Sequence, residues 1–413
     1  MDLPGANTII VRHSEIGTKS SQVQAKMERQ LGANLQEHLN SRKIPGSIST
    51  EYGRVFVHSQ QPRKAANVAA RTFGVISASP AIEVEPTESA IIDTVTTIAP
   101  TVYTEGSFAV RVRRAGPKER HSFTSQELES IAGSAIWESI ESNFDPVVDL
   151  ENPDITFSIE CRDDSAYIFI DTLRGPGGFP YGTQGTVVSL ISGGTDSPVA
   201  AYEMMRRGCT IVPVYFDFEE YGGIDHVARV VEATRKIASY TPTGKLSLMR
   251  VPIGDKVQEL LNTTTETRML SLRRLMFAIA SYVADEVGAV GIATGEALGQ
   301  KSSQTGPNLA ATATVSPYPI HRPLLNEDKE SIIRQAKMIG TYEESRIEAG
   351  CNRVAPSFPV TAATAEEVEE AEPPNFLAAI EILYQNSEFI PVSAVSNQST
   401  SRQEAVQHGV NQR

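Results

Sequence analysis

The sequence predicts a multidomain protein that is α+β in its first part and α/β in its second, where a doubly wound parallel sheet is expected. Three observations support this fold class. The chain has 413 residues, too many for one ordinary core. Residues 1–60 show a strand–helix–strand pattern. After the linker-like run Gly175-Pro176-Gly177-Gly178, strands and helices alternate, as they do in parallel sheets that are covered by helices.

Residues 1–60 have the pattern of a small α+β module. Apolar residues cluster over 8–12 and alternate over 54–58, which is typical of strands. The helix expected over 21–39 places four apolar side chains on one face, namely Val23, Met27, Leu31 and Leu35.

Residues 61–174 predict a second α+β domain. The expected helices are 64–73, 86–98 and 125–139, and the expected strands are 74–77, 107–114, 156–160 and 167–170. Thr124 or Ser125 is the candidate N-cap of the third helix. The last two strands are expected to form an antiparallel hairpin.

Residues 175–375 carry the α/β alternation. The expected strands are 186–191, 210–216, 246–251 and 289–293, and the expected helices are 198–207, 224–239 and 270–287. Residues 376–413 are acidic and then rich in Ser, Gln and Asn, so we expect a tail that is partly disordered.

The composition, with 40% hydrophobic and 21% charged residues, is that of a globular protein. No apolar run is long enough to span a bilayer, and the N-terminus shows no secretory signal, so we expect a cytoplasmic protein without a membrane partner. The formal net charge of −13 argues against general nucleic-acid affinity but is compatible with a local basic patch. Salt adaptation and compositional drift explain the acidic, lysine-poor composition equally well.

The run from Ser192 to Pro198, SGGTDSP, follows an apolar strand and opens a helix. Its glycines let backbone amides approach a phosphate, and the helix N-terminus adds partial positive charge. Pro198 suits a first helical turn, and Asp196 beside a phosphate suits a residue that holds a metal or orients a substrate. The run lacks the GxxxxGK[ST] pattern of the P-loop. We therefore expect an ATP site of another class, with an ordinary strand–helix turn as the alternative.

This SGGxDS string resembles the signature of the PP-loop ATP pyrophosphatases, which cleave ATP between the α- and β-phosphates and adenylate a carbonyl oxygen. Its surroundings resemble the ThiI family, the tRNA 4-thiouridine synthetases. The segments that carry this resemblance are IVRHSEIGTK (10–19), GPGGFPYGTQ (175–184), TGEALGQKSSQT (294–305), HRPL (321–324) and DKE (328–330). The resemblance extends over residues 7–360 in family order.

The resemblance implies three domains: a ferredoxin-like domain (1–60), a THUMP RNA-binding domain (61–174) and a PP-loop domain (175–375). It also implies a form without the rhodanese domain that many bacterial members append. ATP, with the Mg²⁺ that accompanies it, is the expected cofactor. The implied ATP contacts are Leu190, Ile191, Ser192, Gly193, Gly194, Ser197, Tyr215, Phe216, Arg273, Gly295 and Gln304.

The resemblance also implies three catalytic residues, namely Asp196, Lys329 and Cys351. Lys329 would neutralise charge that develops on the α-phosphate. Without the resemblance, a solvated lysine at a helix start is the simpler interpretation. Cys351 lies at the family's persulfide-carrying position, and a thiolate is the nucleophile that this chemistry needs.

The other two cysteines, Cys161 and Cys209, have the settings of structural residues, since a lone cysteine is more often a small buried hydrophobe. Cys351 is not part of the CxxC that some archaeal members carry at this point. We therefore expect no iron–sulfur cluster and no protein-bound metal. Without a rhodanese domain, the expected route is a persulfide on a single cysteine with an external reductant or sulfide. A resolving role for Cys161 or Cys209 would require that thiol to lie near Cys351.

The predicted tRNA contacts are Arg111, Arg113, Arg114, Lys118, Arg120 and Phe123. Arginines on a strand and a basic loop would meet phosphates, and the aromatic ring would stack on a base. A solvated edge strand protected by charge is the alternative. The similarity to a THUMP strand and loop favours RNA binding.

We therefore expect ATP-dependent sulfur transfer that gives 4-thiouridine at position 8 of tRNA. The expected partners are tRNA and a cysteine desulfurase or another sulfur donor, and the resemblance suggests a homodimer. Sulfur transfer to a thiamine-pathway sulfur carrier protein is the alternative activity. A tRNA-binding module with an inactive nucleotide site is a third hypothesis, against which the intact glycines, Asp196 and Lys329 argue.

Overall fold

The computed structural model describes residues 2–13, 15–51, 53–115, 121–223, 225–264, 266–345 and 354–394. The chain divides into two compact units, residues 1–180 and 181–413. Within the described ranges, every helix is too short or too polar to cross a bilayer.

The first unit is built on one mixed sheet. In spatial order its strands are β2 (Ser47–Glu51), β3 (Arg54–His58), β1 (Thr8–Arg12), β4 (Ser77–Val84), β8 (Ala166–Phe169), β7 (Ile155–Cys161), β5 (Ser107–Arg114) and β6 (Val147–Val148), with β9 (Leu173–Arg174) also paired to β4. The pairs β1–β3, β1–β4, β4–β8 and β7–β8 are antiparallel, whereas β5 pairs with β7 in parallel. The strands expected at 8–12, 54–58 and 107–114 are confirmed.

The middle strand β4 joins the two parts of this sheet. Its first half pairs with β1, with Ala78 opposite Val11, and its second half pairs with β8, with Ile82 opposite Ile168. The sheet is therefore continuous from β2 to β6. The strand expected at 74–77 is in fact longer and lies later in the chain.

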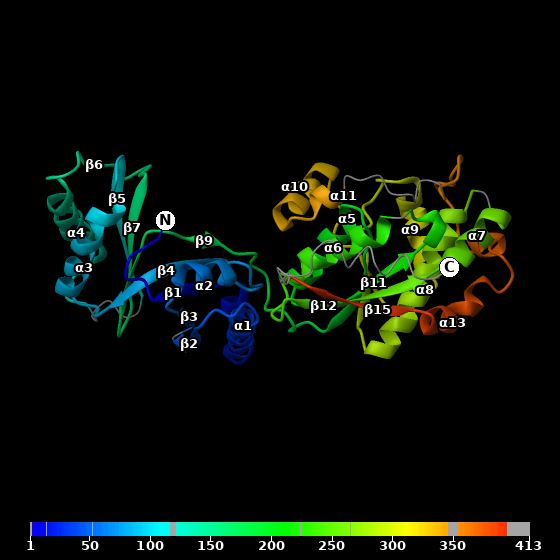
Figure 1. The fold of residues 1–413 in the computed structure, drawn as a ribbon, viewed down its shortest axis with the longest axis horizontal. Coiled ribbons are helices and arrows are strands. Elements are labelled where there is room, and N and C mark those ends of the chain that lie inside the picture. Colours follow the sequence, from blue (N-terminus) through cyan, green and yellow to red (C-terminus); the bar gives the residue numbers. More distant parts are fainter. Residues whose placement is uncertain are drawn as a thin grey trace, which may run out of the picture. The chain divides into compact units, whose positions relative to one another are not determined.

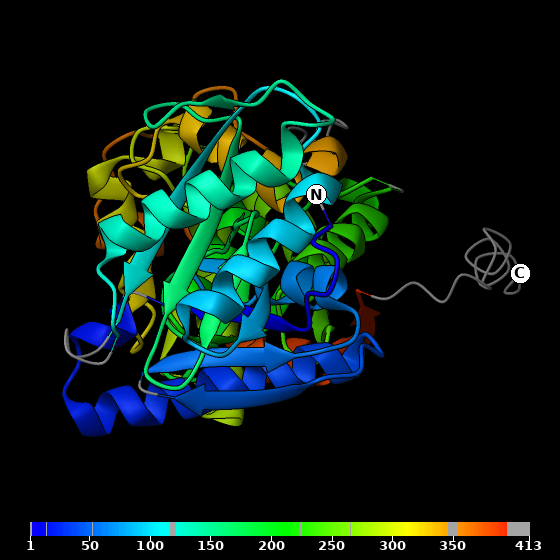
Figure 2. The same ribbon diagram turned by 90° about the vertical axis from the view of Figure 1, so that its left-hand side faces the viewer.

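Helices cover one face of this sheet. They are α1 (Ser21–Ser41), α2 (Pro62–Ala69), α3 (Glu88–Val102) and α4 (Ser125–Ile140), preceded by the short 3₁₀ helix η1 (Glu15–Thr18). The first two pack with Ile9 and Val11, and the other two pack with Val110 and Ile159. Helices α3 and α4 lie side by side (Figure 2). A capping box between Thr124 and Glu127 begins α4, as expected at this position.

The opposite face of the sheet carries a buried charge cluster. Because strand side chains alternate between faces, Arg12 and Arg54 point away from the helices. Glu160, 3% exposed, lies among three arginines at N···O distances of 3.2 Å (Arg12), 3.5 Å (Arg54) and 3.1 Å (Arg162). Burial alone raises the pKa of Glu160, but the arginines outweigh it, so the pKa lies below its usual value. This Glu160 cluster connects strands from both halves of the sheet.

The second unit has the doubly wound sheet that the alternation predicts. Its strand order is β14 (Ile320–His321), β13 (Gly291–Ala293), β10 (Thr186–Leu190), β11 (Thr210–Asp217), β12 (Lys245–Pro252) and β15 (Glu388–Ser393). The first five strands are mutually parallel, and β15 is antiparallel to β12 (Figure 1). The edge strand β15 was not predicted, since it lies in the segment that we assigned to a polar tail. Residues 395–413 lie outside the described residues.

Helices flank this second sheet. They are α5 (Asp196–Arg206), α6 (His226–Ala238), α7 (Gly254–Thr263), α8 (Arg268–Val287), α9 (Gly306–Ala313), α10 (Lys329–Ile339), α11 (Tyr342–Ser345), α12 (Ala365–Ala371) and α13 (Ile380–Gln385), with 3₁₀ turns η3 (Glu219–Tyr221), η4 (Ser302–Gln304) and η6 (Phe376–Ala379). The chain moves from β10 to β12 through α5 and α6 and returns to β13 through α8. Right-handed crossovers place α8 on the opposite face from α5 and α6. Ligands of such sheets bind where the strand order reverses, here at the carboxyl ends of β10 and β13.

Candidate active site

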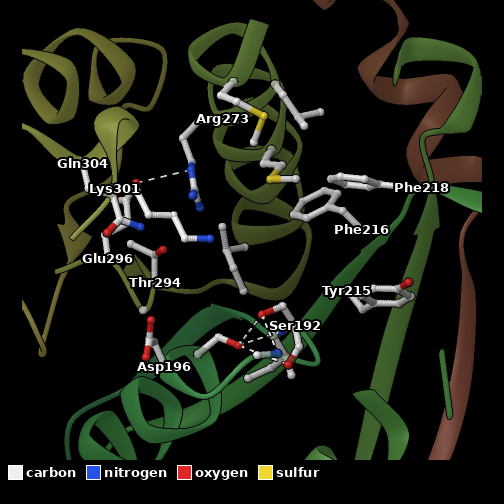
Figure 3. Close-up of a pocket in the computed structure, with 18 of the residues that line it drawn as sticks. Ser192, Asp196, Tyr215, Phe216, Phe218, Arg273, Thr294, Glu296, Lys301 and Gln304 are labelled. Carbon is white, nitrogen blue, oxygen red and sulfur yellow. Dashed lines mark hydrogen bonds and ion pairs between the residues drawn. The ribbon is translucent and has the colours of Figure 1, made fainter. Parts of the chain in front are cut away.

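A cavity of about 240 Å³ opens at this point of reversal (Figure 3). Its lining includes every predicted ATP contact except Gly193: Leu190, Ile191, Ser192, Gly194, Ser197, Tyr215, Phe216, Arg273, Gly295 and Gln304. Asp196 lines it as well. The sequence did not single out Phe218, His226, Met269, Leu272, Met276, Thr294, Glu296 and Lys301, which complete the lining.

Hydrogen bonds to its own serine side chains hold the loop after β10 in shape. The Ser192 N–H donates to Ser197 Oγ at 2.8 Å, and the two hydroxyls lie 2.9 Å apart. The Gly194 N–H reaches Ser192 Oγ at 3.3 Å. Helix α5 begins at Asp196, two residues before the predicted start, so its N-terminal end faces the cavity. This arrangement suits an anionic group at the loop.

Two glycines of the site are closely packed, and Gly295 is the more tightly packed of the two. A Cβ on Gly295 would lie 2.7 Å from Ser197 N and 2.8 Å from the carbonyl carbon of Asp196, so only glycine lets the segment after β13 run this near to the start of α5. A Cβ on Gly193 would meet the side chain of Arg229 at 3.2 Å, and Arg229 also donates to the Gly193 carbonyl at 2.9 Å. Gly193 therefore packs against Arg229 and is not among the residues that line the cavity.

The far side of the cavity is apolar. Its walls come from β10, β11 and α8, and they consist of Leu190, Ile191, Phe216, Phe218, Met269, Leu272 and Met276. An aromatic base fits such walls, whereas a triphosphate fits the polar loop at the other end. The cavity thus has the two-part character that a nucleotide requires.

Positive charge lies between these two ends. Glu296 is 1% exposed and is held by Arg273 at 3.3 Å and by Arg322 at 2.8 Å. Two guanidinium groups share one carboxylate, so this cluster keeps a net positive charge that favours phosphate. Arg273 and Lys301 extend into the cavity from different sides (Figure 3).

Asp196 and Lys329 meet at the start of α5. The Lys329 Nζ lies 2.6 Å from Asp196 Oδ1, and Gln300 donates to Asp196 Oδ2 at 3.1 Å. The N-cap residue Asp328 accepts from the Ser331 N–H and fixes the start of α10, from which Lys329 extends. The two residues that we predicted as catalytic, from positions 133 residues apart, are therefore in contact.

Comparisons with known proteins show which family the chain belongs to. A probable tRNA sulfurtransferase of Halobacterium salinarum is 48% identical over 370 residues, which are 90% of this chain and 94% of that protein. The chain belongs to the tRNA sulfurtransferase family. A second probable tRNA sulfurtransferase, from Methanosarcina acetivorans, is 38% identical over 357 residues, with 86% of both chains covered.

Domain models match in the order expected of a tRNA sulfurtransferase. The ThiI ferredoxin-like domain matches residues 8–79, the THUMP domain residues 85–171, and the thiamine biosynthesis protein (ThiI) model residues 182–375. A crystal structure of a 4-thiouridine synthetase–RNA complex with bound ATP has a TM-score of 0.81 and 27% identity, and covers 94% of this chain and 100% of that one. A Pyrococcus horikoshii protein has a TM-score of 0.63 at 27% identity, with 81% and 99% covered.

In this member of the tRNA sulfurtransferase family, the amino-acid residues that we predicted to contact tRNA do not all lie on one surface. Arg111 and Arg113 are exposed, and the alternation along β5 directs them away from the face that carries Val110 and Val112. The Arg111 guanidinium donates to the Leu150 carbonyl. Arg114 lies on the other face, and its guanidinium donates to the Phe123 carbonyl. Lys118 and Arg120 lie outside the described residues.

The prediction that Phe123 stacks on a base is wrong. Its side chain is 4% exposed, belongs to the core beneath α3 and α4, and stacks on His121 with ring centroids 5.4 Å apart. The ring of Phe123 is therefore part of the core, whereas Arg111 and Arg113 are exposed.

The cysteines fall into two groups. Cys161 and Cys209 are buried free thiols; burial raises the pKa of Cys161 to about 11 and also raises the pKa of Cys209. Neither thiol is therefore activated as a nucleophile, which agrees with the structural role that we expected. Cys351 lies outside the described residues.

Proposed function

We propose that this protein uses ATP to convert uridine 8 of tRNA into 4-thiouridine. The observation that carries the proposal is the cavity at the reversal point, where the phosphate loop, the Asp196–Lys329 pair and an apolar base site occur together. The relatives named as probable tRNA sulfurtransferases and the neighbour described as a 4-thiouridine synthetase–RNA complex with bound ATP support the substrate assignment.

In the first step, uridine O4 attacks the α-phosphorus of ATP, the bond to the bridging oxygen breaks, and pyrophosphate leaves. The loop and the N-terminal end of α5 hold the phosphates, while Lys329 and Arg273 stabilise the developing charge. Mg²⁺ would enter with ATP. Asp196, at the start of α5, would hold this ion together with the phosphates, because Mg²⁺ binds through one or two carboxylates and substrate phosphates; in the free protein the same carboxylate is paired with Lys329.

In the second step, the terminal sulfur of a Cys351 persulfide attacks C4 and AMP leaves. Two thiol equivalents of an external reductant then cleave the S–S bond between Cys351 and the new sulfur, which releases 4-thiouridine, returns the cysteine and leaves the reductant as a disulfide. A cysteine desulfurase or another donor must reload the persulfide. For tRNA binding, we propose the helix-free face of the first unit, where Arg111 and Arg113 lie on the same side as the Glu160 cluster.

Nucleoside mass spectrometry tests the proposal. A deletion strain should lack 4-thiouridine, the wild-type gene should restore it, and Cys351→Ser should not. Cys209→Ala, which changes a buried thiol, is the matched control and should restore the modification. Normal 4-thiouridine in the Cys351→Ser strain would show that the persulfide assignment is wrong. Release of AMP and pyrophosphate with unmodified tRNA tests the adenylation step separately.

Sulfur transfer to a thiamine-pathway carrier protein is the second candidate function. It is favoured by the match of residues 182–375 to the thiamine biosynthesis protein (ThiI) model. The same adenylation chemistry would act on a carrier's C-terminal carboxylate. Thiamine auxotrophy of the deletion strain, with relief by the wild-type gene, is expected if this activity exists; growth without thiamine excludes it.

A further inference from the structure

His226 is a polar side chain of the cavity that the proposed chemistry does not use. His226, the first residue of α6, is 5% exposed and lines the cavity next to Tyr215. Its Nδ1 lies 2.7 Å from the Tyr215 hydroxyl. Because Nδ1 already contacts the Tyr215 hydroxyl, Nε2 is the polar atom that His226 can offer to a ligand.

Asp217 and Tyr215 determine which ring nitrogen of His226 carries the proton. Asp217 is 4% exposed, its Oδ2 accepts from Arg250 Nε at 2.7 Å, and its Oδ1 accepts from the Glu219 N–H at 2.9 Å. A carboxylate only accepts hydrogen bonds, so the Tyr215 hydroxyl donates its single proton to Asp217 Oδ1 at 3.1 Å. The Tyr215 oxygen must then accept from His226, whose Nδ1 bears the hydrogen.

The imidazole is also kept neutral. Burial lowers the pKa of His226, and the nearby Arg229 lowers it further. A neutral ring with its proton on Nδ1 has a lone pair on Nε2.

We infer that His226 is a positioning residue that accepts a hydrogen bond, through Nε2, from a donor group of the bound nucleotide. The inference rests on the proposed function, because it requires ATP in this cavity. ATP offers two kinds of donor, the adenine 6-amino group and the ribose hydroxyls. The phosphate oxygens and the unsubstituted ring nitrogens are acceptors and cannot pair with Nε2. His226 therefore selects for the nucleoside part of ATP.

Analogues that lack one donor each test the inference. The full chain and its His226→Phe variant are titrated calorimetrically with ATP, 2′-deoxy-ATP, 3′-deoxy-ATP and purine riboside triphosphate, which lacks the 6-amino group. The wild type should bind one of these analogues about three- to tenfold more weakly than ATP, as expected for one neutral hydrogen bond. That analogue identifies the donor. The variant should bind ATP more weakly by a similar factor and no longer distinguish it from this analogue.

Two further variants separate recognition from folding. Tyr215→Phe removes the acceptor that fixes the proton on Nδ1 and should reduce the discrimination while leaving the imidazole in place. His226→Gln retains a hydrogen-bond acceptor and should keep part of the discrimination between ATP and the analogue. This variant tests the inference if His226→Phe does not fold. An equal loss for all nucleotides, or unchanged ratios in every variant, would overturn the inference. Failure of the wild type to bind ATP would instead contradict the proposed function.

Discussion

Substitution of Gly295 by alanine tests whether the close approach of the segment after β13 to α5 builds the phosphate site. The added Cβ would lie 2.7 Å from Ser197 N, 2.8 Å from the Asp196 carbonyl carbon and 2.9 Å from Ser197 Cα. All three are backbone atoms, so no side-chain rotation relieves the clash. Ordinary contact begins at about 3.4 Å, and the start of α5 must therefore move away from the segment after β13 by about 0.7 Å.

The expected cost follows from this displacement. Forced overpacking destabilises a protein by about 1–3 kcal/mol. For a unit of this size, 2 kcal/mol lowers the melting temperature by about 4–8 °C. The same shift moves the start of α5 and the adjoining loop, which we propose hold the phosphates. Loss of one charge-assisted hydrogen bond weakens ATP binding by about tenfold or more.

Differential scanning calorimetry with and without ATP measures both effects, since ATP raises only the transition of the unit that binds it. Gly194→Ala is the matched control, because its Cβ would meet nothing closer than Ser192 Oγ at 3.5 Å. It should weaken ATP binding, because it adds a methyl group within the phosphate loop, but leave the melting temperature of the free protein within about 2 °C. If Gly295→Ala melts like the wild type and binds ATP normally, the close approach has no structural role.

Three other predictions concern separate regions. Glu160→Gln should lower the stability of the first unit by about 3 kcal/mol or more, because it leaves three largely buried arginines without their carboxylate; chemical denaturation measures this. His38 is 1% exposed, and burial, with a further contribution from Arg42, lowers its pKa to about 3. Below about pH 6.5 the imidazole of His38 binds a proton in the unfolded chain but not in the folded protein. The free energy of unfolding should therefore fall by about 2 kcal/mol between pH 6.5 and pH 5, and His38→Gln should abolish this loss. Lys329→Met should retain ATP binding but slow AMP release by about 100-fold or more.

Each of these predictions has a control or a contradicting result. Glu105→Gln removes the same charge from an exposed side chain and should change stability by less than about 0.5 kcal/mol. Equal pH profiles for wild type and His38→Gln would show that His38 is not the group responsible. Lys329→Arg should recover part of the AMP release, and loss of ATP binding in Lys329→Met would assign that lysine to substrate affinity.

Local signals in the sequence indicated the phosphate loop, and the family resemblance supplied most of the other predicted residues that line the cavity. The strand, the small-residue turn and the following helix are consecutive in the sequence, so the loop from Ser192 to Ser197 could be predicted from neighbours in the chain. Residues that reach the cavity from elsewhere were found only where a family motif marked them, as with Arg273 and Gln304. Glu296 lay within a quoted motif, but its pairing with two arginines depends on tertiary contacts.

Other features could not be predicted, for identifiable physical reasons. His226 is an ordinary first residue of a helix in the sequence, and only its contact with Tyr215 gives it a defined tautomer. Phe123 follows a basic strand, and sequence spacing does not show that the chain turns back into the core. Strand β15 is short and lies among polar residues, and its pairing with β12 supplies the stability that its composition does not.

The shared strand β4 has a consequence for how this protein can be divided. The domain models end at residue 79 and resume at residue 85, so their boundary falls inside a strand that both halves of the sheet need. A fragment cut there would leave one half with an unpaired edge, which invites aggregation. The ferredoxin-like and THUMP halves should therefore be expressed, and exchanged between relatives, as a single piece.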